Sequence, residues 1–219
     1  MMTRLVLALV AAVSLAAPTP APPWAGLPMR TTTHSGTLGD PVNVALEGSK
    51  ADILAAFGKI GWARADPLSP KSDIKLAEAA VLRRRYPTAP VSNLYLFKRA
   101  EDFAVEHELG SVARRDHARF WDTRRRDPAT GLQLWIGDAS RDIGIKVLLR
   151  HKAPVGTTHK IDANLDAERG LIVAALKAAN VVSTTVVEQG IGPTTDGRNG
   201  GGDRFYTDGK VDLIVLKGQ

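Results

Sequence analysis

The sequence predicts an α+β fold: a mixed, largely antiparallel sheet with about three helices packed on it, in a single domain. Apolar segments that alternate with polar residues recur through the middle of the chain between short turns, which indicates antiparallel strands. Amphipathic helical patterns flank this strand-rich region. The chain of 219 residues is 44% hydrophobic and 24% charged, which is ordinary for a globular protein that buries a core without metal or disulfide support.

The N-terminus has the pattern of a cleavable secretion signal. Arg4 precedes an unbroken apolar run at residues 5–17, and Ser14 and Ala16 supply the small residues of a cleavage site. Since the run is shorter than the roughly 20 residues that span a bilayer, we expect no transmembrane helix in the mature chain. We therefore expect a signal peptide at 1–16, a Pro- and Thr-rich unpacked spacer at 17–39 and the folded domain at 40–219. Export to the periplasm, the cell envelope or the medium follows; a retained N-terminal anchor is the alternative.

The first elements of the domain are a strand and two helices. Val42, Val44 and Leu46 alternate as in a strand, and Ser49 is placed to cap a helix that turns Ile53, Leu54 and Phe57 inward. Residues 71–86 predict a second helix, which ends in arginines that complement its dipole. Strands are expected at 93–97 and 102–109, with His107 half-buried on the apolar side of the latter.

The second half of the domain is predicted to be mainly β-sheet. Strands are expected at 112–123, 132–140 and 155–161, followed by a third helix at 164–180 in which Asn180 is the stop signal. A strand at 181–189 precedes a Gly-rich segment, 190–203, which lacks the Lys and Ser/Thr of a phosphate-binding loop and predicts a plain surface loop. The last strand, 204–216, is split by a tight hairpin turn at Asp208-Gly209.

Composition excludes several kinds of chemistry. The chain has no cysteine, so disulfides, thiolate catalysis and Cys-ligated metals are ruled out. No GxSxG or HExxH motif occurs. The net charge is +6, and residues 83–126 alone hold eleven Lys or Arg against six acids. Such a stretch attracts anions or forms a solvated surface that keeps the protein soluble.

One predicted strand carries an unusual face. Arg115, His117, Arg119 and Trp121 alternate, and so project from the same side of the strand. Guanidinium groups bind phosphate or carboxylate through paired hydrogen bonds, and histidine exchanges protons near neutral pH. We therefore take Arg115, Arg119 and Trp121, with the neighbouring Arg114, as candidate ligand-binding residues.

Carboxylates and a second histidine follow on later elements. Asp138, Ser140 and Asp142 alternate on the next strand, and His159 and Asp162 precede the last helix. If these side chains converge, His117, Asp142 and His159 are candidate catalytic residues that act as an acid/base pair or ligate a divalent metal. Surface ion pairs and a helix cap are the alternative.

Four segments in a fixed order carry a family resemblance: 86–97, 114–123, 134–144 and 158–169. Over roughly residues 40–180 the chain resembles the LssY C-terminal domain family, which is associated with a type I secretion locus. Members occur alone or attached to membrane proteins, including ones that resemble phosphatidic-acid-type phosphatases. The resemblance implies a cell-envelope setting and brings no catalytic residues with it.

Three functions fit these observations. The favoured one is an envelope binding or accessory domain for an anionic ligand, such as a small molecule or a lipid headgroup, through a basic face. The second is a hydrolase, acting for instance on a phosphoester, that uses the His/Asp/Arg cluster with or without a divalent metal. The third is a protein-interaction module for an envelope protein. Nucleic acid is the least favoured partner, because export separates the chain from it.

Overall fold

The computed structural model describes residues 21–69, 71–72, 75, 85–150, 153–192 and 196–218. The predicted signal peptide, 1–16, and most of the predicted second helix, 71–86, lie outside them. The described part contains helices α1 (Lys50–Lys59) and α3 (Leu165–Ala178). Its strands are β1 (Arg30–Thr32), β2 (Leu38–Pro41), β3 (Val44–Glu47), β4 (Ala63–Arg64), β5 (Tyr95–Leu96), β6 (Arg99–Ala100), β7 (Phe103–Ser111), β8 (Arg114–Arg126), β9 (Gln133–Arg150), β10 (Ala153–Ile161), β11 (Val182–Gln189), β12 (Asp196–Arg198), β13 (Arg204–Tyr206) and β14 (Lys210–Leu216).

In the part of the chain that the structure describes, strands are the main secondary structure, at 46% against 16% for helices. The prediction of one sheet covered by about three helices is therefore wrong. Two of the reasons are visible in the chain. Strands β8 and β9 are 13 and 18 residues long, longer than their apolar patterns indicated. Strands also form at 30–32, 38–41 and 196–198, where the sequence predicted a spacer and a loop.

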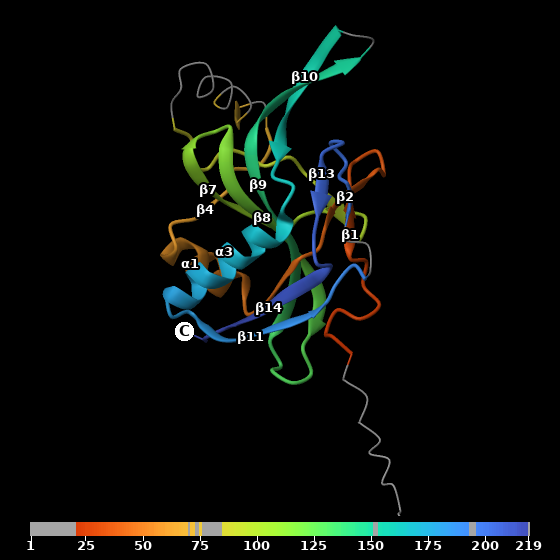
Figure 1. The fold of residues 1–219 in the computed structure, drawn as a ribbon. Helices are drawn as coiled ribbons and strands as arrows, with labels where there is room; N and C mark the ends of the chain where they lie inside the picture. Colours follow the sequence, from red (N-terminus) through yellow and green to blue (C-terminus); the bar gives the residue numbers. More distant parts are fainter. Residues whose placement is uncertain are drawn as a thin grey trace, which may run out of the picture.

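The main sheet has the order β11-β14-β3-β9-β8-β7-β4, and β10 pairs with the distal half of β9. Its pairs are antiparallel except that β14 runs parallel to β3, which agrees with the predicted mixed, largely antiparallel pairing. The distal half of β9 and its partner β10 extend away from the body of the protein (Figure 1). The hairpin predicted at Asp208-Gly209 is wrong: the chain turns there, but β13 pairs with β12 and β14 pairs with β11 and β3.

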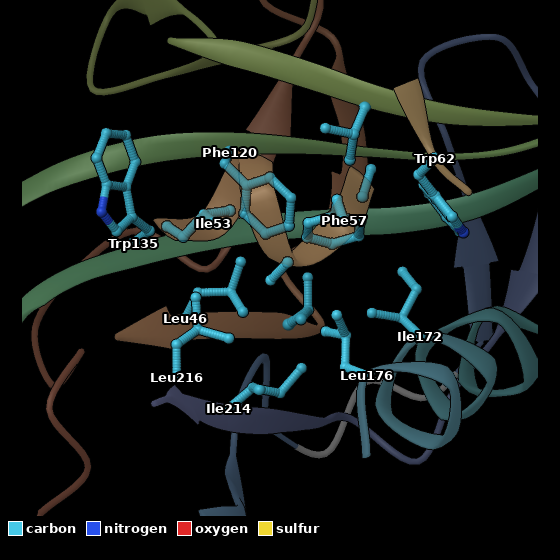
Figure 2. Packing of buried hydrophobic residues seen from close by; sticks show 14 of the residues in the cluster. Leu46, Ile53, Phe57, Trp62, Phe120, Trp135, Ile172, Leu176, Ile214 and Leu216 are labelled. Atoms are coloured by element: carbon cyan, nitrogen blue, oxygen red, sulfur yellow. The ribbon is translucent and has the colours of Figure 1, made fainter. Parts of the chain in front are cut away.

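The two faces of the main sheet bury different clusters. Phe120 and Leu46 point toward α1 and α3 and belong to the larger apolar cluster, part of which is drawn in Figure 2. Their neighbours in sequence, Trp121 and Ala45, point the other way and pack with residues of the N-terminal segment and β5. Since strand side chains alternate, both faces of this sheet are buried where the strands cross its centre.

The folded part begins before residue 40, within the predicted spacer. Trp24 is 2% exposed, and its indole Nε1 donates a hydrogen bond of 2.8 Å to the carbonyl of Gln189. Strands β1 and β2 join β5 and β6 in a second sheet of order β2-β1-β5-β6. This N-terminal segment closes the second face of the main sheet and brings Gly39 and Asp40 to the site described below.

The helix ends follow the sequence signals. Ser49 caps α1 in a reciprocal box with Asp52, and the buried residues of α1 include Ile53 and Phe57. Asn164 caps α3 by accepting a hydrogen bond from the backbone of residue 167. Beyond α3, Asn180 adopts a φ of 56°, the left-handed conformation that ends helices. The predictions for Ser49 and Asn180 are confirmed, because such signals depend on residues close in sequence, whereas Asn164 was predicted as the first residue of the helix and is its cap.

Candidate functional site

The alternate residues Arg115, His117 and Arg119 of β8 project from one face of the main sheet, as predicted. Their exposed fractions are 2%, 2% and 5%, so this polar face is buried. Ala118 and Phe120, on either side of Arg119, belong to the apolar cluster on the helix side. A row of ionisable groups is therefore enclosed between the sheet and the segments that cover it, a costly arrangement unless every charge is paired.

The antiparallel register supplies those partners from both neighbouring strands. Residues directly opposite each other in such a pair point to the same side. On β7, Glu106 lies opposite His117. On β9 the three opposite pairs are Arg115 with Asp142, His117 with Ser140, and Arg119 with Asp138.

Arg115 is fully engaged in holding the site together. Its Nε donates to Asp142 Oδ2 at 2.9 Å and its Nη1 to Glu106 Oε2 at 2.7 Å. Its Nη1 and Nη2 also donate to the carbonyls of Ala89 and Pro90, both at 3.1 Å. One guanidinium thus ties β7, β9 and the segment before β5 together, which makes Arg115 a positioning residue.

Arg119 is also held by hydrogen bonds, but part of its guanidinium group has no hydrogen-bond partner in the part of the chain that the structure describes. Its Nε donates to the carbonyl of Ser92 at 2.9 Å and its Nη1 to Asp138 Oδ2 at 2.8 Å. Its Nη2 has no hydrogen-bond partner among the described residues. A buried guanidinium with one fixed edge and one free edge can receive an anion without losing further side-chain entropy.

Asp142 lies between the two histidines. His117 Nδ1 is 3.6 Å and His159 Nδ1 is 3.9 Å from Asp142 Oδ2, close enough for electrostatic contact. The other ring nitrogens are engaged: His117 Nε2 is 3.1 Å from Ser140 Oγ, and His159 Nε2 is 3.1 Å from the carbonyl of Val112. The three candidate catalytic residues therefore meet, as the sequence analysis hypothesised.

Burial makes both histidines neutral at neutral pH. Burial lowers the pKa of His117 well below its usual value, and the nearby Arg119 and Arg115 lower it further. The pKa of His159 is also lowered by burial, against the opposing effect of Asp142. Each ring therefore has one nitrogen that can accept a proton or hydrogen bond.

The carboxyl groups behind the site hold their protons unusually tightly. Burial raises the pKa of Asp138 to about 7 and that of Glu106 to about 8, although the arginines beside them act in the opposite direction. Burial also raises the pKa of Asp40, against the effect of Arg119 and a side-chain hydrogen bond with Asn199. Near neutral pH Asp138 and Asp40 therefore carry less negative charge toward Arg119 than fully ionised carboxylates would.

A cavity of about 290 Å³ is lined by side chains that include Asp40, Arg115, His117, Arg119, Asp142 and His159. Its walls are the polar face of β8 and β9, His159 of β10, residues 39–40, residues 91–94 and the Gly-rich residues 199–201. Two lining atoms, Asp40 Oδ1 and His117 Nδ1, are buried without a hydrogen-bond partner in the described structure. Unpaired buried polar atoms are rare, so their presence in one cavity indicates that a ligand or water completes the site.

The prediction made for the Gly-rich segment, 190–203, is wrong. The segment was predicted to be a plain surface loop, yet it contains β12, which pairs with β13, and its residues 199–201 line the cavity. Asn199 folds the loop by accepting hydrogen bonds from the backbone N–H groups of Gly201 and Asp203. Gly200 lies so close to Thr33 that a β-carbon would overlap it, which explains a glycine there.

Two of the four predicted ligand-binding residues lie elsewhere. Arg114 is exposed, because it alternates with Arg115 at the start of β8 and points away from the site. Trp121 does share the face of Arg119, but that face becomes apolar at this point, and the indole packs in the second apolar cluster. The basic stretch is thus not one surface: its central arginines are buried in ion pairs and Arg124, Arg125 and Arg126 are exposed.

No group of three or more His, Cys, Asp or Glu among the described residues is arranged to hold a metal ion. Asp142 Oδ2, which faces both histidines, already accepts a hydrogen bond from Arg115. His107, the histidine on β7, lies outside the cavity; it is half-buried as predicted and stacks on Trp62 with ring centroids 6.2 Å apart. Neither helix in the described part of the chain has the length and hydropathy to cross a bilayer.

A family model described as "LssY C-terminus" matches residues 24–211. The chain belongs to the LssY C-terminus family. Neither the curated proteins nor the solved structures compared with the chain give a match. The cavity lining runs from Thr33 to Asp203, so the whole site lies within the LssY C-terminus region. The match also extends beyond the expected 40–180 at both ends, to Trp24 and through β11–β13, in agreement with the fold.

Several residues of this LssY C-terminus site were not predicted. Asp40 is the first residue of the predicted domain, directly after the predicted spacer, and Asn199 lies in the segment that was predicted to be a loop. Glu106 precedes His107 on a strand for which the sequence analysis considered only the apolar side. The alternation of Glu106 and Glu108 with Val105 did signal a second face, but nothing local indicated that this face would be covered.

Proposed function

We propose that this chain is a binding domain for a small anionic ligand, which Arg119 holds in the cavity. The observation that carries the proposal is the state of Arg119: its guanidinium is buried and fixed by Asp138 and Ser92, while Nη2 remains without a partner in the described structure at a cavity wall. Charge-assisted hydrogen bonds from guanidinium to phosphate, sulfate or carboxylate are strong, particularly where water is excluded. Arg115, predicted as a direct contact, instead positions the site.

The proposed function agrees with the location outside the cytoplasm that we expect from the N-terminal sequence. A signal peptide at 1–16 and export place such a domain in the periplasm, the cell envelope or the medium, where phosphate-containing lipids and metabolites are available ligands. The family membership is compatible with this setting. Binding of an envelope protein elsewhere on the surface stays a separate hypothesis from the sequence.

The experiment is a calorimetric titration of the full chain with sulfate, which stays a dianion between pH 5 and 9. We expect one saturable site whose affinity rises by about five- to tenfold from pH 8 to pH 6. The sign follows from Asp138: its pKa is about 7, so above that pH its carboxylate neutralises Arg119 and repels the anion, and below it the proton removes both effects.

Asp138→Asn is the matched variant for this titration. The amide oxygen still accepts the hydrogen bond from Arg119 but carries no charge, so the variant should bind sulfate at pH 8 about as tightly as the wild type does at pH 6. An affinity that stays unchanged with pH in the wild type, or one that rises with pH, contradicts the role given to Asp138.

Hydrolysis of a phosphoester is the second candidate, favoured by the position of Asp142 between two neutral histidines. His159 is the more accessible of the two, with its side chain 18% exposed against 3% for His117, and so is the better candidate to exchange a proton with a bound ester or water. Phosphate release from p-nitrophenyl phosphate should then be lost in His159→Gln while sulfate binding persists. Sulfate binding by the wild type without any release supports the binding domain alone.

A further inference from the structure

The cavity offers more hydrogen-bonding groups than a bare anion uses. At its rim, the exposed side chains of Ser92 and Asn93 have no hydrogen-bond partner within the described residues. Deeper in, Asp142 is held by Arg115 through Oδ2 alone, which leaves Oδ1 as a free acceptor. Asp40 Oδ1 adds a fourth unpaired group. These neutral and acidic groups suit hydroxyl groups of a ligand, which donate and accept at once.

Large apolar side chains are few in the cavity lining. Of its described lining residues, the large apolar side chains are Val91 and Leu94, which are only 4% and 8% exposed, and none is aromatic. Ligand sites usually bind apolar groups on a mostly apolar lining. An acyl chain or aromatic ring would therefore find few apolar side chains to pack against, whereas a polyol could form hydrogen bonds with the free groups at the rim.

The volume indicates the size of the part of a ligand that the cavity can hold. At the roughly 30 Å³ that a water molecule occupies in the liquid, the 290 Å³ cavity has room for about ten waters. That corresponds to a ligand on the order of ten non-hydrogen atoms, the size of a three-carbon polyol joined to a phosphate.

We propose that the ligand is a hydroxylated phosphoester of about the size of glycerol phosphate, with its phosphate at Arg119 and its hydroxyls at the Ser92–Asn93 rim and Asp142. This inference rests on the proposed anion-binding function and adds the class of ligand. The same chemistry is found in soluble polyol phosphates and in the headgroup of a glycerol-bearing phospholipid, and the two sources can be separated experimentally.

The test compares three ligands on the full chain by calorimetry at pH 6: inorganic phosphate, n-propyl phosphate and glycerol 3-phosphate. The last two differ only in the hydroxyls. Glycerol 3-phosphate should bind about tenfold or more tightly than n-propyl phosphate, since two well-placed hydrogen bonds contribute at least that factor. Equal or tighter binding of n-propyl phosphate overturns the ligand class but leaves anion binding intact. Failure of all three ligands, inorganic phosphate included, overturns the proposed function itself.

Asn93→Leu provides a variant that should fold normally, because Asn93 is exposed and no described residue bonds its side chain. It should weaken glycerol 3-phosphate about fivefold and leave inorganic phosphate unchanged. If the variant loses the same affinity for both ligands, or for neither, the rim does not bind the hydroxyl groups of the ligand.

Whether the ligand is a soluble polyol phosphate or a lipid headgroup is decided by sedimentation of the protein with vesicles of phosphatidylcholine, with or without phosphatidylglycerol. Binding only to the phosphatidylglycerol vesicles, displaced by glycerol 3-phosphate, assigns the ligand to a lipid headgroup. Glycerol 3-phosphate binding without vesicle binding assigns it to a soluble polyol phosphate. Vesicle binding that glycerol 3-phosphate does not displace contradicts the cavity as the headgroup site.

Discussion

Replacing Arg119 with methionine is expected to weaken sulfate binding about a hundredfold or more, because it removes the buried cation that faces the cavity. Methionine fills similar space, and Asp138, whose pKa is already about 7, can take up a proton once its partner is gone. The variant should therefore stay folded. Arg119→Lys restores the charge without the planar fork and should recover only part of the affinity. Calorimetric titration, with circular dichroism to monitor folding, measures both.

Arg114→Met is the control for charge alone. Arg114 lies five residues from Arg119 on the same strand, and its side chain is exposed and points away from the cavity. If sulfate binds in the cavity, this variant should lose less than about twofold in affinity, a long-range electrostatic effect that salt screens. Comparable losses in Arg114→Met and Arg119→Met would show that the anion binds to general surface charge.

Replacing Arg115 with methionine is expected to have the largest effect on stability, a loss of about 3–5 kcal/mol in the free energy of unfolding. The substitution leaves the carboxyl groups of Asp142 and Glu106 buried without their cation and two backbone carbonyls without their donor. Breaking a buried pair on one side costs far more than the pair contributes, since the remaining charge stays desolvated. Urea denaturation followed by tryptophan fluorescence gives the value.

A second substitution separates this mechanism from a general packing defect. Glu106→Gln removes one of the two carboxyl groups left without a cation, so at a pH where Glu106 is ionised the double variant with Arg115→Met should be more stable than Arg115→Met alone, by about 1–2 kcal/mol. The recovery should grow above pH 8, because the pKa of Glu106 is about 8 and its carboxylate is the costly form. A double variant less stable than the single one, or an Arg115→Met loss below about 1 kcal/mol, contradicts the ion-pair account.

The features that depend on local periodicity could be predicted from the sequence. Alternation along a strand is fixed by backbone geometry, so Arg115, His117 and Arg119 had to share a face, and so did Asp138, Ser140 and Asp142. The short turn between β8 and β9 then made these two faces neighbours. The cap at Ser49 and the stop signal at Asn180 are equally local. For these reasons the convergence of His117 and Asp142 was a sound hypothesis.

The burial of the site could not be predicted in the same way. A strand face of arginine, histidine and acids has the composition of a solvent-exposed face, and only distant segments reveal that it is covered. Those segments contact the sheet through long-range pairs, such as the hydrogen bond from Trp24 to Gln189, 165 residues away. Neither β1, in a Pro- and Thr-rich stretch, nor β12, in a Gly-rich one, has a strand-like apolar pattern. Their formation depends on tertiary pairing, which overrides local propensity.

The most direct test of the account is the location of the anion. Selenate is a tetrahedral dianion like sulfate, and selenium scatters anomalously, so a crystal of the protein grown with selenate identifies the bound ion without ambiguity. The account predicts an anomalous peak inside the cavity, within hydrogen-bond distance of Arg119 Nη2 and absent from crystals of Arg119→Met. Peaks found only at the exposed arginines of β8, with the cavity holding water alone, would contradict it.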